Sequence, residues 1–100
     1  MATLTGKQRR HLRAEAHALR PVVRVGRHGV SKAVLHEIDK ALADHELVKV
    51  QYVAEKQEKR QLEDQVELGL RAASAGGIGH VLIFYRQHAD PEKRRYTLPR

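Results

Sequence analysis

The chain has 100 residues, and its composition restricts the classes of protein to which it can belong. A hydrophobic content of 41% indicates one small globular domain over residues 1–100, with a core of about residues 4–99. No apolar run reaches the ~18 residues of a membrane span, and no signal-peptide apolar region opens the chain, so we expect a cytoplasmic protein. The lack of cysteine excludes disulfide scaffolds and thiolate metal sites.

The excess positive charge lies in the first third of the chain. The formal net charge is +7. Residues 1–32 hold eight Lys or Arg and one acid, Glu15, whereas residues 33–100 hold eleven residues of each sign. A one-sided field attracts a polyanion, although a basic N-terminal region can also serve solubility alone.

Residues 5–19 have the spacing of an amphipathic helix. At ~100° per residue, one stripe is apolar and the opposite stripe is basic. The basic stripe consists of Lys7, Arg10, Arg13 and His17. Pro21 ends the helix, because the residue before a proline is disfavoured in helical geometry. We expect the basic stripe to contact a ligand rather than only to be solvated.

A short strand, a glycine loop and a second helix follow. Residues 21–25 are rich in β-branched side chains, which favours a strand. The sequence Gly26-Arg27-His28-Gly29 then forms a loop, and Ser31 is the expected N-cap of the second helix.

The second half of the chain predicts two more strands around a third helix, and a short final strand. The strands are expected at residues 46–54, 81–85 and 95–98, the last two forming a hairpin. The third helix is expected over residues 59–75, stopped by the glycine pair that follows it, while residues 55–61 either open this helix or form an exposed loop. The order αβαβαββ predicts an α/β domain with a mixed sheet.

The glycine loop has the position and composition of an anion site. A loop between a strand and a helix N-terminus presents unpaired N–H groups and the positive end of the helix dipole. Gly26 and Gly29 let the backbone approach a sugar–phosphate closely, and Arg27 and His28 are expected to project toward the same phosphates. A Gly-x-x-Gly sequence alone often marks only a tight turn, so its place inside the basic third is what favours function.

The chain resembles the YhbY-like family, also called the CRM domain, for chloroplast RNA splicing and ribosome maturation. The resemblance covers nearly the whole chain. Its residues are 4–8, 12–13, 16–17, 21–23, 25–30, 45–50, 79–86 and 98–99.

This resemblance implies a four-stranded mixed sheet with three helices, similar to the C-terminal domain of bacterial translation initiation factor three. It also implies RNA binding, with ribosomal RNA of large-subunit precursors as the partner, since one copy of the domain looks like the stand-alone bacterial type. The family's Gly-x-x-Gly loop carries over onto Gly26, Arg27, His28 and Gly29. The family more often has lysine where this chain has Arg27, which keeps the charge, and the residue type at the position of His28 is expected to vary within the family.

Four further basic sites have roles that follow from their positions. Lys32 flanks the glycine loop and is expected to contact RNA. Lys49 lies in the middle of a predicted strand, where it either reaches RNA or pairs with an acid. Arg86 is expected to form a structural pair, and residues 93–95 to form a solvated tail. Because only four residues are Phe, Tyr or Trp, we expect contacts to phosphates rather than base stacking.

We expect no catalysis, no cofactor and no metal. The seven histidines are scattered without metal-ligand spacing, and no nucleophile-elbow or phosphate-loop pattern occurs. The alternative to an RNA-binding protein is an adaptor that docks on ribosomal or assembly proteins through the charged helix at residues 59–71. No coiled-coil pattern argues for a dimer, so we expect a monomer.

Overall fold

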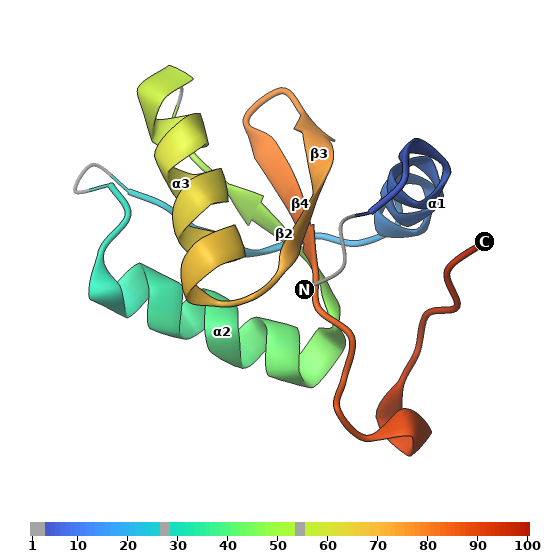
Figure 1. Ribbon diagram of the computed structural model, residues 1–100. Coiled ribbons are helices and arrows are strands. Elements are labelled where there is room, and N and C mark those ends of the chain that lie inside the picture. Colours follow the sequence, from blue (N-terminus) through green and yellow to red (C-terminus); the bar gives the residue numbers. More distant parts are fainter. Residues whose placement is uncertain (1–3, 27–28, 54–55) are drawn as a thin grey trace.

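A four-stranded mixed sheet with helices on both faces forms the centre of the molecule (Figure 1). The computed structural model describes residues 4–26, 29–53 and 56–100. The elements in chain order are α1 (Gly6–Ala16), β1 (Pro21–Arg24), α2 (Lys32–His45), β2 (Leu47–Gln51), α3 (Lys56–Gly69), β3 (Ala73–Ile78), β4 (Val81–Tyr85) and a 3₁₀ turn (Pro91–Lys93). The strands lie in the order β1-β2-β4-β3, with β1 parallel to β2 and β4 antiparallel to both of its neighbours. The predicted order αβαβαββ and the mixed sheet are therefore confirmed.

Side-chain caps fix the starts of α1 and α2. The Thr5 hydroxyl accepts from the Gln8 N–H at 3.1 Å while the Gln8 side chain accepts from the Thr5 N–H at 3.0 Å, which forms a capping box. Ser31 caps α2 as expected, its hydroxyl accepting from the Val34 N–H at 3.1 Å. These caps satisfy donors that the first turn of a helix leaves unpaired.

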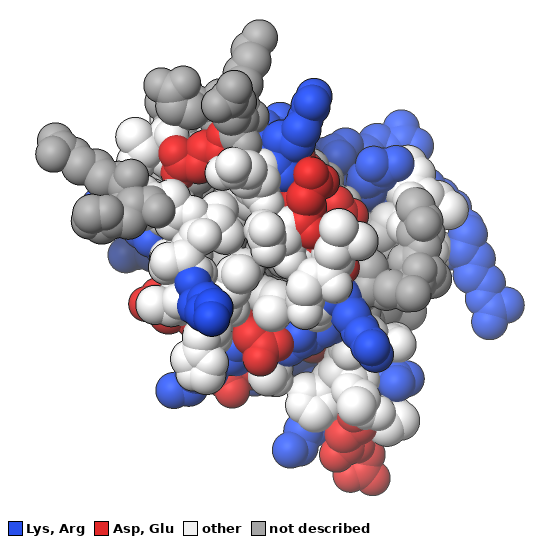
Figure 2. Space-filling model, turned by 60° about the vertical axis from the view of Figure 1, so that its left-hand side comes forward, with Lys and Arg blue, Asp and Glu red and all other residues white. Residues whose placement is uncertain are grey.

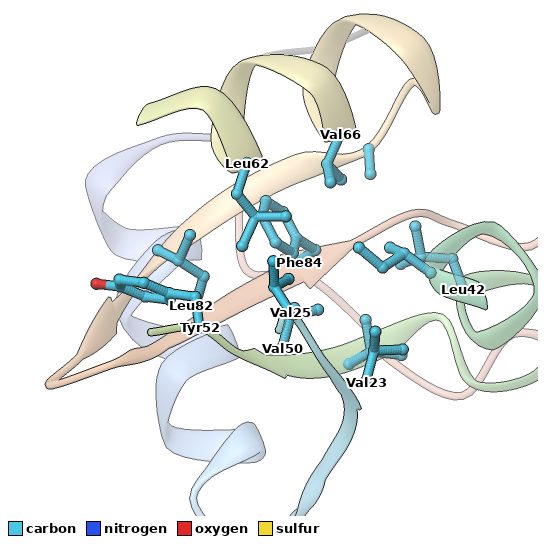
Figure 3. Packing of buried hydrophobic residues seen from close by; sticks show 12 residues of the cluster. Val23, Val25, Leu42, Val50, Tyr52, Leu62, Val66, Leu82 and Phe84 are labelled. Carbon is cyan, nitrogen blue, oxygen red and sulfur yellow. The ribbon is translucent and has the colours of Figure 1, made fainter. Parts of the chain in front are cut away.

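Helices α2 and α3 cover one face of the sheet and enclose the larger core. In Figure 3, Leu62 and Val66 of α3 point toward Phe84 of β4. Alternation along β2 sends Val48 and Val50 into this core. All five of these side chains are at most 1% exposed.

Helix α1 covers the opposite face, together with the C-terminal segment of residues 86–100. Leu12 and Ala16 of α1 are fully buried against strand residues that include Leu47 and Ile83. Tyr96 of the C-terminal segment packs on the same cluster. In Figure 1, α1 lies to the right of the sheet, α2 and α3 lie to the left, and the C-terminal segment passes below α1.

Two of the predicted elements are wrong. Residues 73–75 were expected to end the third helix, but they open β3, and α3 ends earlier at Gly69. Arg71 at φ +55° turns the chain out of the helix. The hairpin of the sheet is accordingly β3–β4. Alanine, serine and glycine have low strand propensity, so only pairing with β4 makes this segment a strand.

Residues 95–98 form no strand. The Arg95 N–H is bound by the Glu46 carboxylate, and Tyr96 and Leu98 pack their side chains on the core without joining the sheet. Residues 56–61 open α3, which resolves the alternative left by their charge. No helix in the described ranges is long and apolar enough to cross a membrane.

Candidate nucleic-acid interface

Three connections meet at one end of the sheet, which we call the loop end. Arg24 of β1 pairs with Gln51 of β2, Gln51 pairs with Val81 of β4, and Val81 pairs with Ile78 of β3. Gly26 at the start of the glycine loop (residues 26–29), the chain leaving β2 and the β3–β4 turn therefore all lie at this end. The described residues of the loop lie between the end of β1 and the N-terminus of α2 (Figure 1).

The two glycines of the glycine loop are joined by a hydrogen bond. The Gly29 N–H donates to the Gly26 carbonyl at 3.0 Å. Gly29 has φ +70°, a region that favours glycine. Apart from its chain neighbours, no described residue has an atom within 4 Å of where a Cβ on Gly26 would stand, so the Gly26 backbone is open to a ligand. Arg27 and His28, predicted to contact phosphates, lie outside the described residues.

The first turn of α2 follows the loop directly. Ser31 caps the Val34 N–H, and the N–H groups of Lys32 and Ala33 have no acceptor among the described residues. Lys32 is exposed at this helix start. Free N–H groups, the helix dipole and an ammonium group together favour an anion here.

The basic stripe of α1 is only partly a free surface. Lys7, Arg10 and His17 are exposed, as predicted. Arg13 is half-buried instead, and its guanidinium donates to the Ala75 carbonyl of β3 at 2.8 Å. Arg13 thus holds α1 on the edge of the sheet. Arg9, exposed on the same helix, was not among the predicted contacts, although the local charge count already included it.

The structure does not bring α1 and the glycine loop together. Helix α1 packs on the face of the sheet opposite to α2, and in Figure 1 the two regions stand at the right and left edges of the molecule. Among the predicted site residues, Gly26, Gly29 and Lys32 lie at the loop end, while Lys7, Arg10, Arg13 and His17 lie on α1. The charge count treated residues 1–32 as one basic region, whereas the fold places α1 and the glycine loop apart.

Lys49 and Arg86 have structural partners. Lys49 is half-buried and its ammonium donates to the Leu19 carbonyl at 3.0 Å, so it does not project freely, and it pairs with no acid of the described residues. Arg86 donates to Asp39 Oδ1 at 2.6 Å and to the Leu70 carbonyl at 2.9 Å, and so joins β4 to α2 and to the end of α3. The expected structural pair at Arg86 is confirmed.

Two of the tyrosines pack together where the C-terminal segment meets the core. Tyr85 and Tyr96 meet edge to face with ring centroids 6.5 Å apart. Burial raises the pKa of Tyr85, and the neighbouring Glu46 carboxylate raises it further. Burial, followed by Glu15, also raises the pKa of Tyr96. These rings pack against each other and are not a flat platform for bases.

The last residues of the C-terminal segment lie beside α1. Gln8 of α1 donates to the Pro99 carbonyl at 3.0 Å, and the Lys7 ammonium lies 3.4 Å from the Arg100 carbonyl. Residues 93–95, expected to be a solvated tail, are exposed but belong to a segment folded back on the molecule. On the face drawn in Figure 2, basic and acidic side chains are mixed over the centre, and basic ones gather toward the upper right edge.

A small α/β domain with two basic regions, one at the loop end and one on α1, is thus defined. Residues 4–86 match the model of the CRS1 / YhbY (CRM) domain, and the chain belongs to this family. It is 39% identical over 101 residues to a Haemophilus influenzae protein named as an RNA-binding protein, covering 100% of this chain and 99% of that one. It is 33% identical over 97 residues to YqeI of Bacillus subtilis, named as a probable RNA-binding protein, covering 96% and 99% of the two chains.

A solved structure has the same fold. The solution structure of a hypothetical Staphylococcus aureus protein, described as a candidate RNA-binding protein, superposes with a TM-score of 0.81. The two sequences are 30% identical, and the match covers 97% of this chain and 100% of the other. The family predicted from the sequence and its fold are both confirmed.

Proposed function

We propose that this protein binds RNA, without catalysing a reaction, mainly through contacts to phosphates. The partner we propose is ribosomal RNA in precursors of the large subunit, and the role is that of a ribosome assembly factor. The family and the names of its relatives support RNA as the ligand. The ribosomal partner is supported by the resemblance to stand-alone bacterial family members.

The observation that carries this proposal is the set of exposed cations without acidic partners. In the part of the chain that the structure describes, Arg86 alone among Lys and Arg forms an ion pair with a carboxylate. Arg24 and Lys32 at the loop end, and Lys7, Arg9 and Arg10 on α1, therefore keep their charge available. Binding of such cations to phosphates releases counterions, which makes it favourable at low salt.

The loop end supplies the closest approach to a phosphate. Its bare glycine backbone, the first turn of α2 and Lys32 meet within a few residues, which gives one phosphate several donors at once. The exposed face of α1 supplies a second region for a folded RNA. In this proposal Arg13 and Lys49 act by holding α1 and residue 19 in place, not by direct contact.

Charge reversal tests the proposal. The double variant Arg10→Glu with Arg27→Glu is expected to reduce the affinity for a large-subunit ribosomal RNA fragment by more than about 100-fold at ~0.1 M salt. The matched control is Lys40→Glu with Lys93→Glu, two exposed cations outside both regions. Filter binding measures the affinity, and circular dichroism checks the fold. Unchanged affinity in a folded double variant contradicts the proposal.

A protein-interaction adaptor is the second candidate, and one feature of α3 favours it. Leu68 is 83% exposed on this helix, next to the acidic Glu67, and an exposed leucine suits a protein partner. Salt dependence separates the two functions. RNA binding through roughly five phosphates gives a slope of log affinity against log salt of about −3.5, whereas adaptor binding gives a shallow slope.

A further inference from the structure

A shallow pocket lies at the loop end, beside the start of the glycine loop. It has a volume of about 360 Å³ and is lined by Arg24, Gln51, Tyr52, Val53 and His80. These residues come from the ends of β1 and β2 and from the β3–β4 turn. None of the lining residues that the structure describes is acidic, and Val53 leaves 53% of its surface exposed at the pocket wall.

We propose that this pocket holds one unpaired nucleobase of the bound RNA, stacked against His80 and the Arg24 guanidinium. This inference rests on the proposed RNA binding and deepens it. Nucleobases stack on histidine rings and on guanidinium planes as well as on Phe, Tyr and Trp. A count of Phe, Tyr and Trp therefore overlooks both groups.

The planar groups of the pocket are held in place by neighbours. The His80 ring is exposed and lies with its centroid 5.8 Å from that of Tyr52, at an interplanar angle of 52°. Tyr52 is itself fixed, because its hydroxyl donates to the Gly79 carbonyl at 3.1 Å and its N–H to the His80 carbonyl at 2.8 Å. The Arg24 guanidinium donates to Gln51 Oε1 at 3.3 Å. A base entering here meets groups that lose little freedom on binding.

The position of the pocket relates it to the phosphate site. The Val25 N–H donates to the Gln51 carbonyl at 2.8 Å, so the sheet pairing continues up to the glycine loop. Two residues of extended chain, from Arg24 to Gly26, span at most ~7 Å. A strand with a phosphate at the loop therefore has a neighbouring nucleotide at the pocket. In a duplex that base is paired and cannot enter, so the pocket selects single-stranded or bulged RNA.

The test uses the full chain and a single strand of roughly 12 nucleotides with one 2-aminopurine, alone or annealed to its complement. We expect the single strand to bind the wild-type protein with quenching of the 2-aminopurine fluorescence. His80→Ala is expected to weaken single-strand binding roughly tenfold, to abolish the quenching and to leave duplex affinity unchanged. Arg24→Lys, which keeps the charge, is expected to weaken it less. His36→Ala, an exposed histidine of α2, is the matched control.

The outcomes separate the pocket from the proposed function. Wild-type protein that binds neither RNA overturns the proposed function and the pocket with it. RNA binding that His80→Ala leaves unchanged, or that it weakens equally for strand and duplex, overturns the pocket alone. If the protein binds a free mononucleotide as tightly as the single strand, the proposed RNA pocket is also overturned, because the neighbouring nucleotides then contribute nothing. A ring-current shift of the His80 imidazole proton signal on adding the strand, assigned with the His80→Ala spectrum, supports stacking directly.

Discussion

At the scale of single residues, a buried carboxylate connects the C-terminal segment to the core. Glu46 is 1% exposed and accepts from the backbone N–H groups of His88 and Arg95. It adopts φ +65°, which is unfavourable for a residue with a side chain and persists only because its surroundings hold it. Nothing in the local sequence distinguishes Glu46 from a solvated acid at a helix end.

Replacing Glu46 tests this role. Glu46→Gln keeps one acceptor oxygen but replaces the other by an NH₂ group. This group is a donor and faces a backbone N–H, which is also a donor. The free energy of unfolding should fall by about 1–3 kcal/mol, because hydrogen bonds to a charged group are lost. Urea unfolding measures the change, with the exposed Glu37→Gln of α2 as the control. Equal stability of the two variants contradicts the role.

Tyr85 gives a pH-dependent prediction. Its hydroxyl is buried without a hydrogen-bond partner among the described residues, and its pKa is raised above the ordinary value of 10.0 by burial, with Glu46 adding to the effect. The folded state therefore favours the neutral phenol. Its stabilising contribution is complete below pH 10.0 and is lost as the pH rises through the folded-state pKa.

The variant Tyr85→Phe removes that titration. At pH 7 it should unfold at the same or a higher urea concentration than the wild type, because a buried hydroxyl without a partner is removed. Above pH 10.0 it should lose less stability than the wild type. Urea unfolding at both pH values measures this. A variant that is markedly less stable at pH 7 indicates a partner for the hydroxyl and contradicts the prediction.

At the scale of elements, the sequence predicted those whose pattern is local. Helix α2 has a cap and an amphipathic period and strand β4 is a continuous apolar run, and both lie where they were predicted. Strand β3 was not predicted from the sequence, because its residues Ala-Ser-Ala-Gly-Gly have low strand propensity and do not reveal what packs against them. The reason is non-local: α1 lies close above β3, where Arg13 Nη1 stands 3.3 Å from the position of a Cβ on Gly76.

Gly77 offers a test of β3. A Cβ at Gly77 would stand 2.0 Å from the Val81 carbonyl oxygen, a clash with backbone that no rotamer relieves. Gly77→Ala should therefore lower the free energy of unfolding by more than about 2 kcal/mol, since overpacking forces the backbone to shift. Gly69→Ala is the control, because its Cβ meets open space. Thermal unfolding compares the two. Equal melting temperatures would show that the hairpin does not pack this closely.

At the scale of the whole molecule, the sequence predicted which basic residues form the candidate site but not how they are arranged in space. The sequence located the excess charge in residues 1–32, and the family resemblance gave the fold. Which cations share a surface depends on which face of the sheet each helix covers, and the hydrophobic periodicity of the sequence does not reveal this. The same limit applies to the nucleobase pocket, since Arg24 and His80 are 56 residues apart in the sequence and meet only through the pairing of three strands.

The separation of the two basic regions predicts a dependence on RNA length. The molecule measures 36 × 24 × 24 Å, and the glycine loop and α1 lie on different sides of the sheet. A stacked strand of roughly six nucleotides spans only about 20 Å, shorter than the 36 Å long axis of the molecule, so we expect it to contact one region at a time. Lys32→Glu at the loop end should therefore weaken binding of this strand severalfold, whereas Arg10→Glu on α1 should leave it unchanged.

A folded fragment of large-subunit ribosomal RNA is large enough to reach both regions. Both variants should weaken its binding, and their effects on the free energy of binding should add, because the sites are distant and share no partners. Filter binding with both RNAs measures the four affinities, and the Lys93→Glu variant controls for net charge. Equal weakening of the short strand by Arg10→Glu would mean that α1 and the glycine loop act as one surface, against the separation that the sheet imposes.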